Sequence, residues 1–453
     1  MSLPIEEAQP VFVSKLSHEG RGIAHVNGKT TFVFGALPNE EVVLSYHNRR
    51  ARFDEASAHK VLVPSLTRVE PRCQFFGLCG GCSLQHMSQS AQIAFKQDVL
   101  IEQLRHFGKV VPEQILPPLV AEGYGYRRKA RYSVRFVKKK QKMLLGFREL
   151  FHPRFLAEIN TCHVLHPKLA RLIAPLQETL GGFINKEHIA QVEAAVGDNA
   201  TALVVRHLEE MPASDQEELI AFAESFNVWL FLQPAGYDSI HKIWPKDSDS
   251  LLTYNLVDGV TLYFHPTDFT QVNAGINRLM IQQAIALLDP RAEDNILDLF
   301  CGLGNFSLPL AKRGARVTGI EGDARMVMRA FLNAQKNSVD SASFMALDLN
   351  KEESIACLPR ANKVLIDPPR SGAQEIVSRL PLDQVESLLY VSCNPSTLAR
   401  DAGILKDRGF GLKKVLVMDM FTHTEHVEAM ALFCPNVTAR ISTRGDCCPI
   451  VGS

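Results

Sequence analysis

Apolar and polar residues alternate over short stretches at the start of the chain. Between residues 11 and 66, runs such as VFVSKLS are separated by turn-forming residues, among them Asn27-Gly28. Alternation predicts strands with one buried face, and Asn-Gly between two such runs predicts a tight hairpin. Several short strands at this spacing favour a small β-barrel within residues 1–66.

The pattern changes after the barrel. Residues 91–108 place apolar side chains on one helical face and end at Gly108, which predicts an amphipathic helix. We expect this helix to pack on the carboxyl-terminal domain. The remainder of the segment 67–268 is rich in predicted strands, with one helix near 213–226, and we interpret it as a central α+β domain.

Helix and strand patterns alternate in residues 269–437. Such alternation predicts a parallel, doubly wound α/β sheet of the Rossmann-like kind. The polar segment 438–453 is predicted to be a flexible tail. The predicted helices are 274–288, 306–313 and 324–337, and the predicted strands are 295–300, 315–321, 343–349, 363–369 and 387–393.

The composition is that of a large globular protein. The chain has 453 residues, of which 46% are hydrophobic and 22% are charged, so wholesale disorder and a small disulfide scaffold are both excluded. The opening MSLPIEEAQP lacks an apolar run, and no segment approaches 18 uninterrupted apolar residues. We therefore expect a cytoplasmic protein that does not enter a membrane, in which the ten cysteines are metal-binding, catalytic or buried.

The net charge is zero, but it is unevenly distributed. Residues 123–150 hold ten basic side chains and a single acidic one, Glu149, so this stretch carries +9 and the rest of the chain −9. A concentrated basic stretch with interleaved aromatic residues favours an anion-binding face that contacts RNA. The alternative interpretation is a solvated hairpin.

A glycine loop follows the first predicted strand of the α/β domain. Asp298 precedes Gly302 and Gly304, and glycines there let the backbone approach a ligand closely. Ser307 stands where a dinucleotide-binding loop has its third glycine, so the pattern favours S-adenosylmethionine over NAD. Glu321 ends the second strand, where a carboxylate can accept the ribose hydroxyls, and Asp348 ends the third, near the adenine.

Reactive side chains follow two later strands. Cys393 ends one strand, and the rigid turn Asp367-Pro368-Pro369 ends another, so both face the functional crevice of a parallel sheet. Glu428 precedes a further apolar strand, where a carboxylate is either a general base or a solvated charge.

Four cysteines outside this sheet form a second candidate site. Cys73, Cys79 and Cys82 are spaced C-x5-C-x2-C, and Cys162 follows in the central domain. Four thiolates suit zinc or an iron–sulfur cluster, and the spacing alone does not choose between them.

Four motifs occur in a fixed order: DLFCGLGNFSLPLA, IDPPRSG, SCNPSTLARD and HVEAMALF. Together with Gln271-Val272-Asn273, they make the chain resemble the RNA uracil-5 methyltransferase family from about residue 11 to 435. The front end resembles a TRAM RNA-binding barrel. With the cysteines, it is most similar to the branch of the family that acts on 23S ribosomal RNA.

The resemblance implies a function for each motif. It implies that Cys393 adds to carbon 6 of a uridine and that Glu428 removes the carbon-5 proton after methylation. It also implies a [4Fe-4S] cluster on the four cysteines and a monomer that binds 23S ribosomal RNA. The implied cofactor-lining residues are Gln271, Phe300, Asn305, Glu321, Asp348 and Asp367.

Three other hypotheses remain at this stage. One is a tRNA uracil-5 methyltransferase, and another is a catalytically inert iron–sulfur protein that binds RNA. The third, cytosine-5 methylation, is disfavoured because the Pro-Cys dipeptide typical of those enzymes is absent from the sequence.

Overall fold

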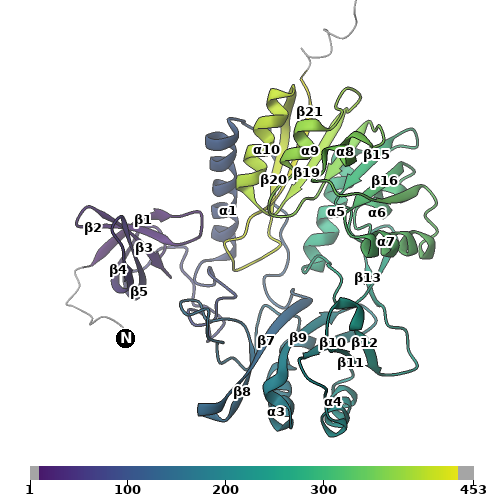
Figure 1. Cartoon of the computed structure of the whole chain (residues 1–453). Helices are drawn as coiled ribbons and strands as arrows, with labels where there is room; N and C mark the ends of the chain where they lie inside the picture. The colour runs from purple at the N-terminus through teal and green to yellow at the C-terminus, as the bar shows by residue number, and fades with distance from the viewer. Residues whose placement is uncertain (1–9, 437–453) are drawn as a thin grey trace, which may run out of the picture.

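The computed structural model describes residues 10–436, which fold into a barrel, a central unit and a large α/β unit (Figure 1). The predicted flexible tail, 438–453, lies outside the described residues. Within residues 10–436, no helix has both the length and the apolar character needed to span a bilayer.

The amino-terminal barrel is closed by five strands in the order β1-β2-β3-β5-β4, which confirms the predicted β-barrel. At the predicted hairpin, Asn27 and Gly28 have φ values of 50° and 78°, as a two-residue turn with both central residues left-handed requires. Val13, Val33 and Val42 are fully buried in the barrel core. The strands are β1 (Val11–Leu16), β2 (Gly22–Val26), β3 (Lys29–Phe34), β4 (Glu40–Arg49) and β5 (Phe53–Val63).

The central unit is built on a six-stranded sheet in the order β12-β11-β10-β9-β7-β8. Apolar side chains of two helices, among them Leu176 and Phe222, pack into the core of this unit. The second helix coincides with the helix predicted near 213–226. The elements are β7 (Lys129–Val137), β8 (Lys142–Gly146), α2 (Pro167–Ala170), α3 (Ile173–Gly182), β9 (Ile189–Val196), β10 (Thr201–His207), α4 (Ala213–Phe226), β11 (Trp229–Gln233) and β12 (His241–Trp244).

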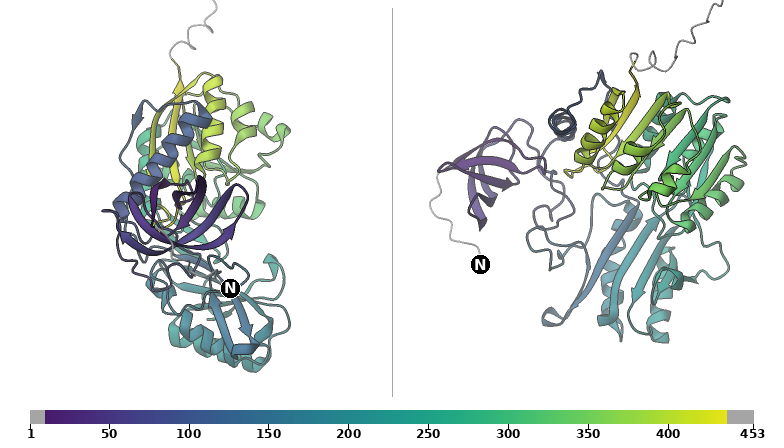
Figure 2. Two further views of the ribbon diagram at one scale, coloured as in Figure 1. Left: turned by 90° about the vertical axis from the view of Figure 1, so that its left-hand side faces the viewer. Right: turned by 45° about the horizontal axis from the view of Figure 1, so that its top comes forward.

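The helix predicted at 91–108 is α1 (Gln89–Gln103), and it continues as a π-helical turn over Leu104–Gly108. It lies between the barrel and the large sheet, where the right-hand view of Figure 2 shows it end-on. A Cβ at Gly108 would lie 2.5 Å from the carbonyl oxygen of Ala399, so this glycine allows close contact with helix α10 (Pro395–Asp407).

The large sheet has eight strands in the order β17-β16-β15-β18-β19-β21-β20-β6. The first five strands in this order are parallel, as the alternating pattern predicts, and β21 runs antiparallel to both of its neighbours. The strand order reverses direction between β15 and β18, which is where open α/β sheets bind their ligands.

The elements of this unit are β6 (Gln114–Ile115), α5 (Ala274–Leu288), β15 (Asn295–Leu299), α6 (Ser307–Lys312), β16 (Arg316–Glu321), α7 (Ala324–Lys336), β17 (Ala342–Ala346), α8 (Glu352–Ala356), β18 (Lys363–Ile366), α9 (Gln374–Arg379), β19 (Ser387–Ser392), β20 (Phe410–Met418) and β21 (Glu428–Pro435), with α10 between β19 and β20. The third parallel strand, β17, stops at Ala346, three residues before the end of the predicted strand 343–349.

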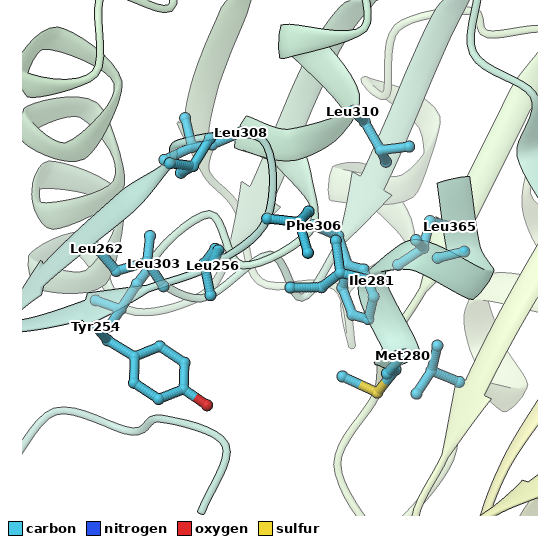
Figure 3. Close-up of a cluster of buried hydrophobic side chains, with 14 of the residues drawn as sticks. Tyr254, Leu256, Leu262, Met280, Ile281, Leu303, Phe306, Leu308, Leu310 and Leu365 are labelled. Carbon is cyan, nitrogen blue, oxygen red and sulfur yellow. The ribbon is translucent and has the colours of Figure 1, made fainter. Parts of the chain in front are cut away.

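A hairpin connects the central and large units. Its strands, β13 (Leu252–Asn255) and β14 (Thr261–Phe264), contribute Tyr254 and Leu262 to a core shared with Leu303 and Phe306 of the glycine loop (Figure 3). The loop that follows β15 therefore packs on a continuous apolar cluster that includes side chains of the hairpin.

Candidate active site and cysteine cavity

The strand register brings Cys393 and Glu428 to one edge of the sheet. Strands β19 and β21 pair antiparallel, with Ser392 opposite Ala429. Cys393 follows Ser392 and Glu428 precedes Ala429, so both residues lie at the same end of the two strands. Cys393 is partly exposed, whereas Glu428 is only 8% exposed. This places a thiol and a carboxyl at the same end of two neighbouring strands.

Burial raises the pKa of both groups. It raises the pKa of the Cys393 thiol to about 11, and the charges of Glu428 and Asp367 add to this effect. Burial also raises the pKa of Glu428 to about 8, with a further contribution from Asp367. Arg370 opposes the shift at both groups, and Lys96 opposes it at Glu428. Glu428 is therefore poised to exchange a proton near neutral pH.

Two further carboxyls follow the adjacent strands. Asp298 lies in β15, and Asp367 follows β18; burial raises the pKa of each to about 7. Asp298 accepts a hydrogen bond from Ser307 on one oxygen, and its other buried oxygen has no partner within residues 10–436. An orphaned carboxylate oxygen at the switch point leaves an acceptor for a bound ligand.

A cavity of about 50 Å³ opens between the glycine loop and the hairpin β13-β14. Phe300 holds a φ of 64°, which is unusual for a residue with a side chain, and the two loop glycines are also left-handed. Four of the predicted cofactor residues line this cavity: Gln271, Phe300, Asn305 and Asp367.

Glu321 and Asn305 hold the glycine loop in place. Glu321, at the end of β16, accepts hydrogen bonds from the backbone N–H groups of Gly302 (3.1 Å) and Gly322 (2.7 Å). Asn305 exchanges two side-chain hydrogen bonds with Asn277 of α5, at 2.9 and 3.0 Å. Hydrogen bonds thus hold the loop from both sides.

Asp348 lies apart from the other predicted residues. Because β17 ends early, Asp348 falls in an exposed loop and accepts hydrogen bonds from the backbone and side chain of Asn350, both at 3.1 Å. These bonds lower the pKa of Asp348. It is absent from the lining of the cavity that holds the other residues.

The four predicted cysteines meet in one cavity of about 140 Å³, together with Phe75, Tyr126 and Phe147. Burial raises the pKa of the thiols of Cys79 to about 11 and of Cys82 to about 12. No group of three or more His, Cys, Asp or Glu side chains in the described chain is arranged to hold a metal ion.

Fewer cations of the basic stretch 123–150 are unpaired than its sequence predicts. Five of its ten cations pair with carboxylates that come from other parts of the central unit: Arg128 with Asp198, Arg131 with Glu193, Lys138 with Glu187, and both Lys140 and Lys142 with Glu158. Arg135 and Lys139 remain exposed and have no carboxylate partner in the described part of the chain.

Three buried charged residues, Lys96, Asp419 and Asp401, are not among the residues that the sequence motifs predict. Lys96 stands four residues before Leu100 and four after Gln92, on the buried face of α1. A lysine within an apolar helical stripe was the available signal, because a buried ammonium requires a partner.

The fold is that of a methyltransferase. The crystal structure of the Pyrococcus abyssi tRNA (uracil-54, C5)-methyltransferase in complex with S-adenosyl-L-homocysteine superposes with a TM-score of 0.70 at 23% identity, and the match covers 94% of this chain and all of that one. Residues 206–434 match the tRNA (Uracil-5-)-methyltransferase family, and residues 6–44 match the TRAM domain.

Curated relatives match nearly the whole chain. The 23S rRNA (uracil(1939)-C(5))-methyltransferase RlmD of Hahella chejuensis is 49% identical over 93% of this chain and 96% of its own length. The proteins of the same name from Legionella pneumophila and Xanthomonas campestris are each 47% identical, over 94% and 93% of this chain and 97% and 96% of their own lengths. The chain belongs to the uracil-5 methyltransferase family.

Proposed function

We propose that this chain methylates carbon 5 of a uridine in 23S ribosomal RNA with S-adenosylmethionine as methyl donor. The observation that carries the proposal is the meeting of Cys393 and Glu428 at the strand ends beside the cavity of the glycine loop. Relatives 47–49% identical over almost the whole chain bear the name of this activity.

Cys393 starts the reaction as a nucleophile. Carbon 5 of uracil is a weak nucleophile, but addition of a thiolate to carbon 6 moves the electron pair of the 5,6 double bond toward carbon 5 and the adjacent carbonyl. Carbon 5 then attacks the methyl carbon of the donor, whose sulfur keeps the electron pair of the broken bond. Arg370 favours the thiolate, because its positive charge lowers the pKa that burial raises.

Glu428 completes the reaction as a base. It takes the proton from carbon 5, the electron pair restores the 5,6 double bond, and the Cys393 thiolate leaves carbon 6. Because the pKa of Glu428 is about 8, it accepts a proton at neutral pH more readily than an ordinary glutamate.

S-adenosylmethionine supplies an electrophilic methyl group, and the residues around the glycine loop fit it. Gln271, Phe300, Asn305 and Asp367 line the cavity, while Glu321 at the end of β16 stands where a ribose would bind. Asp348 lies outside the lining of this cavity, and we keep it in the proposed set only on the motif order.

For the four cysteines we propose a [4Fe-4S] cluster. The support is that Cys73, Cys79, Cys82 and Cys162 line one cavity that is larger than a single ion requires. The cluster has no electron to transfer in the reaction above. We assign it to joining residues 73–82 to the central unit, whose core Cys79 and Cys162 contact.

The activity is tested with defined 23S ribosomal RNA fragments and labelled S-adenosylmethionine, followed by mapping of the modified base. We expect one 5-methyluridine in the rRNA fragment and none in transfer RNA. Methylation of transfer RNA alone would move the assignment to the tRNA branch. RNA binding without methyl transfer would identify an inert binding protein.

The cluster is tested by metal analysis of protein purified without oxygen. We expect a brown protein with four irons, and loss of both colour and solubility in Cys82→Ser. Cys357→Ser is the matched control, because Cys357 is exposed and lies outside the cysteine cavity. A colourless protein with one zinc would refute the iron assignment.

A further inference from the structure

The connection between β20 and β21 leads directly into the proposed base. It runs over residues 419–427 and ends directly at Glu428, the first residue of β21. Asp419, Thr422 and His423 are all buried in this connection. Whatever holds residues 419–427 therefore acts on Glu428 in addition to the strand pairing that places it beside Cys393.

One contact on this connection comes from a lysine 323 residues earlier in the chain. The ammonium of Lys96, on α1, donates to Asp419 Oδ1 at 2.8 Å and to the carbonyl oxygen of Phe421 at 2.9 Å. Lys96 is 0% exposed and Asp419 is 1% exposed. Taking two charges out of water costs several kcal/mol each, so an apolar pair would serve packing at least as well.

Neighbouring residues of the same segment hold the rest of the connection. Gln92 accepts from the backbone N–H of His423 at 2.8 Å, and Gln89 donates to Asp419 Oδ2 at 3.2 Å. Nearer the cysteines, the Ser83 hydroxyl donates to Glu425 and accepts from its backbone N–H. The connection is thus bound along its length by the segment that follows Cys82.

We propose that Lys96 is a positioning residue for the base: through Asp419 and the Phe421 carbonyl it fixes residues 419–427, so that the Glu428 carboxylate stands ready to remove the carbon-5 proton. The charge of Lys96 also reaches Glu428, whose pKa it lowers. This inference rests on the proposed function, because it assigns Lys96 to one step of that reaction.

The test separates the last step from the earlier ones. In Lys96→Met, Cys393 and the glycine loop are untouched, so addition and methyl transfer continue while proton removal slows. We expect a methyl-labelled RNA–protein adduct to accumulate on denaturing gels and to decay about tenfold more slowly than in the wild type, the loss expected from one buried charged hydrogen bond. A purely structural defect would lower adduct formation and product together.

The matched control is a second buried lysine, Lys363, at the start of β18 in the large sheet. Lys363 donates to Asp294 at 2.6 Å and to the carbonyl oxygen of Asp289 at 2.7 Å, at the opposite end of the sheet. Lys363→Met should lose stability as Lys96→Met does, without adduct accumulation. Where Lys96→Met does not fold, the double variant Lys96→Met/Asp419→Asn removes both buried charges, and it should accumulate the adduct.

Equal adduct levels in the Lys96 and Lys363 variants would overturn the inference, and so would normal elimination in the folded double variant. Glu428→Gln distinguishes this failure from failure of the proposed function. That variant should trap the methylated adduct whether or not Lys96 positions it, and the Cys393→Ala variant should trap none. If Glu428→Gln turns over normally, the proposed base is wrong.

Discussion

In the proposed reaction, Glu428 and Cys393 must each lose a proton in surroundings that favour the protonated form. Burial raises the pKa of both, and Arg370 is the cation that opposes this at both positions. A single exposed arginine thereby influences the first and the last step of the proposed reaction.

Replacing Arg370 should shift the pH dependence of methylation. Arg370→Gln removes the positive charge and therefore raises the pKa of both the Cys393 thiol and the Glu428 carboxyl. The pH at which activity rises should increase by about one unit. Activity should fall at pH 7 and rise progressively as the pH increases, with the affinity for S-adenosylmethionine unchanged. Arg379→Gln, on the exposed face of α9, is the control and should leave the profile in place.

The raised pKa of Glu428 should also make the stability of the protein depend on pH. The folded pKa, about 8, lies above the ordinary value of 4.5, so the folded state holds a proton that the unfolded chain releases. Stability from this group is complete below about pH 4 and is lost as the pH rises through 8. Glu428→Gln should therefore raise the unfolding midpoint at pH 9 and change it little at pH 4.

The comparison for that prediction is Asp348→Asn. The pKa of Asp348 is lowered in the fold, so its removal should not stabilise the protein at pH 9. The same gain in both variants would indicate a general effect of removing negative charge rather than the burial of Glu428.

For single residues, the sequence predicts best those positions that depend on local geometry. Cys393 and the glycine loop follow directly from strand ends, and the motif order identifies Glu428. Asp348 is different, because its position depends on where β17 stops, and β17 is an edge strand with only one neighbour to fix its length. Lys96 and Asp419 lie 323 residues apart, and a separation of that size leaves no local pattern.

Among the elements, helix α10 links the two strand ends that carry the site. It begins just after Cys393, and Asp401 near its middle accepts hydrogen bonds from the backbone N–H of Ala373 at 2.7 Å and the hydroxyl of Tyr390 at 2.6 Å. Asn394 donates to the carbonyl oxygen of Arg370 at 3.0 Å. The turn that follows Asp367 is thereby tied to the helix that follows Cys393, the proposed nucleophile.

We expect Asp401→Asn to disturb both stability and catalysis. The amide cannot accept all the hydrogen bonds that the buried carboxylate accepts, which costs about 1–3 kcal/mol. Because the released turn carries Arg370, methylation should fall severalfold more than RNA binding. Tyr390→Phe removes only one of these bonds and should show a smaller loss in denaturant titrations. An unchanged rate in a destabilised Asp401→Asn would show that α10 supports the fold alone.

The elements themselves are largely predictable, because their periodicity is strong. The helix 274–288 coincides with α5, and 213–226 coincides with α4. The π-helical end of α1 is not predictable from its own residues, since it forms where Gly108 meets Ala399 of α10. The carboxylates that pair with the basic stretch 123–150 also come from other elements, so its sequence overstates its free charge.

For the whole molecule, the unpaired cations of the central unit are the candidate RNA contacts. Arg135, Lys139 and Arg154 are exposed, and no carboxylate pairs with them within residues 10–436. Reversing all three to Glu should weaken binding of the rRNA fragment at least tenfold at low salt and flatten its salt dependence. Filter binding or fluorescence anisotropy across a salt series measures both effects.

The control for this prediction reverses three exposed cations elsewhere. Lys312, Arg360 and Lys406 lie at the other end of the large sheet, away from the strand ends that carry Cys393. This triple variant changes the net charge by the same amount. An equal loss of RNA affinity in both variants would show that overall charge, and not the position of these cations, causes the effect.

The packing of α1 against α10 and β20 also has a consequence for synthesis. A ribosome finishes α1 more than 300 residues before it reaches Asp419, so the nascent helix leaves the exit tunnel with an unpaired lysine in its apolar face. Nascent chains that stop before β20 should expose this face to chaperones and proteases. A chain cut between the central and large units should regain a folded α1 only when both pieces are made in the same cell.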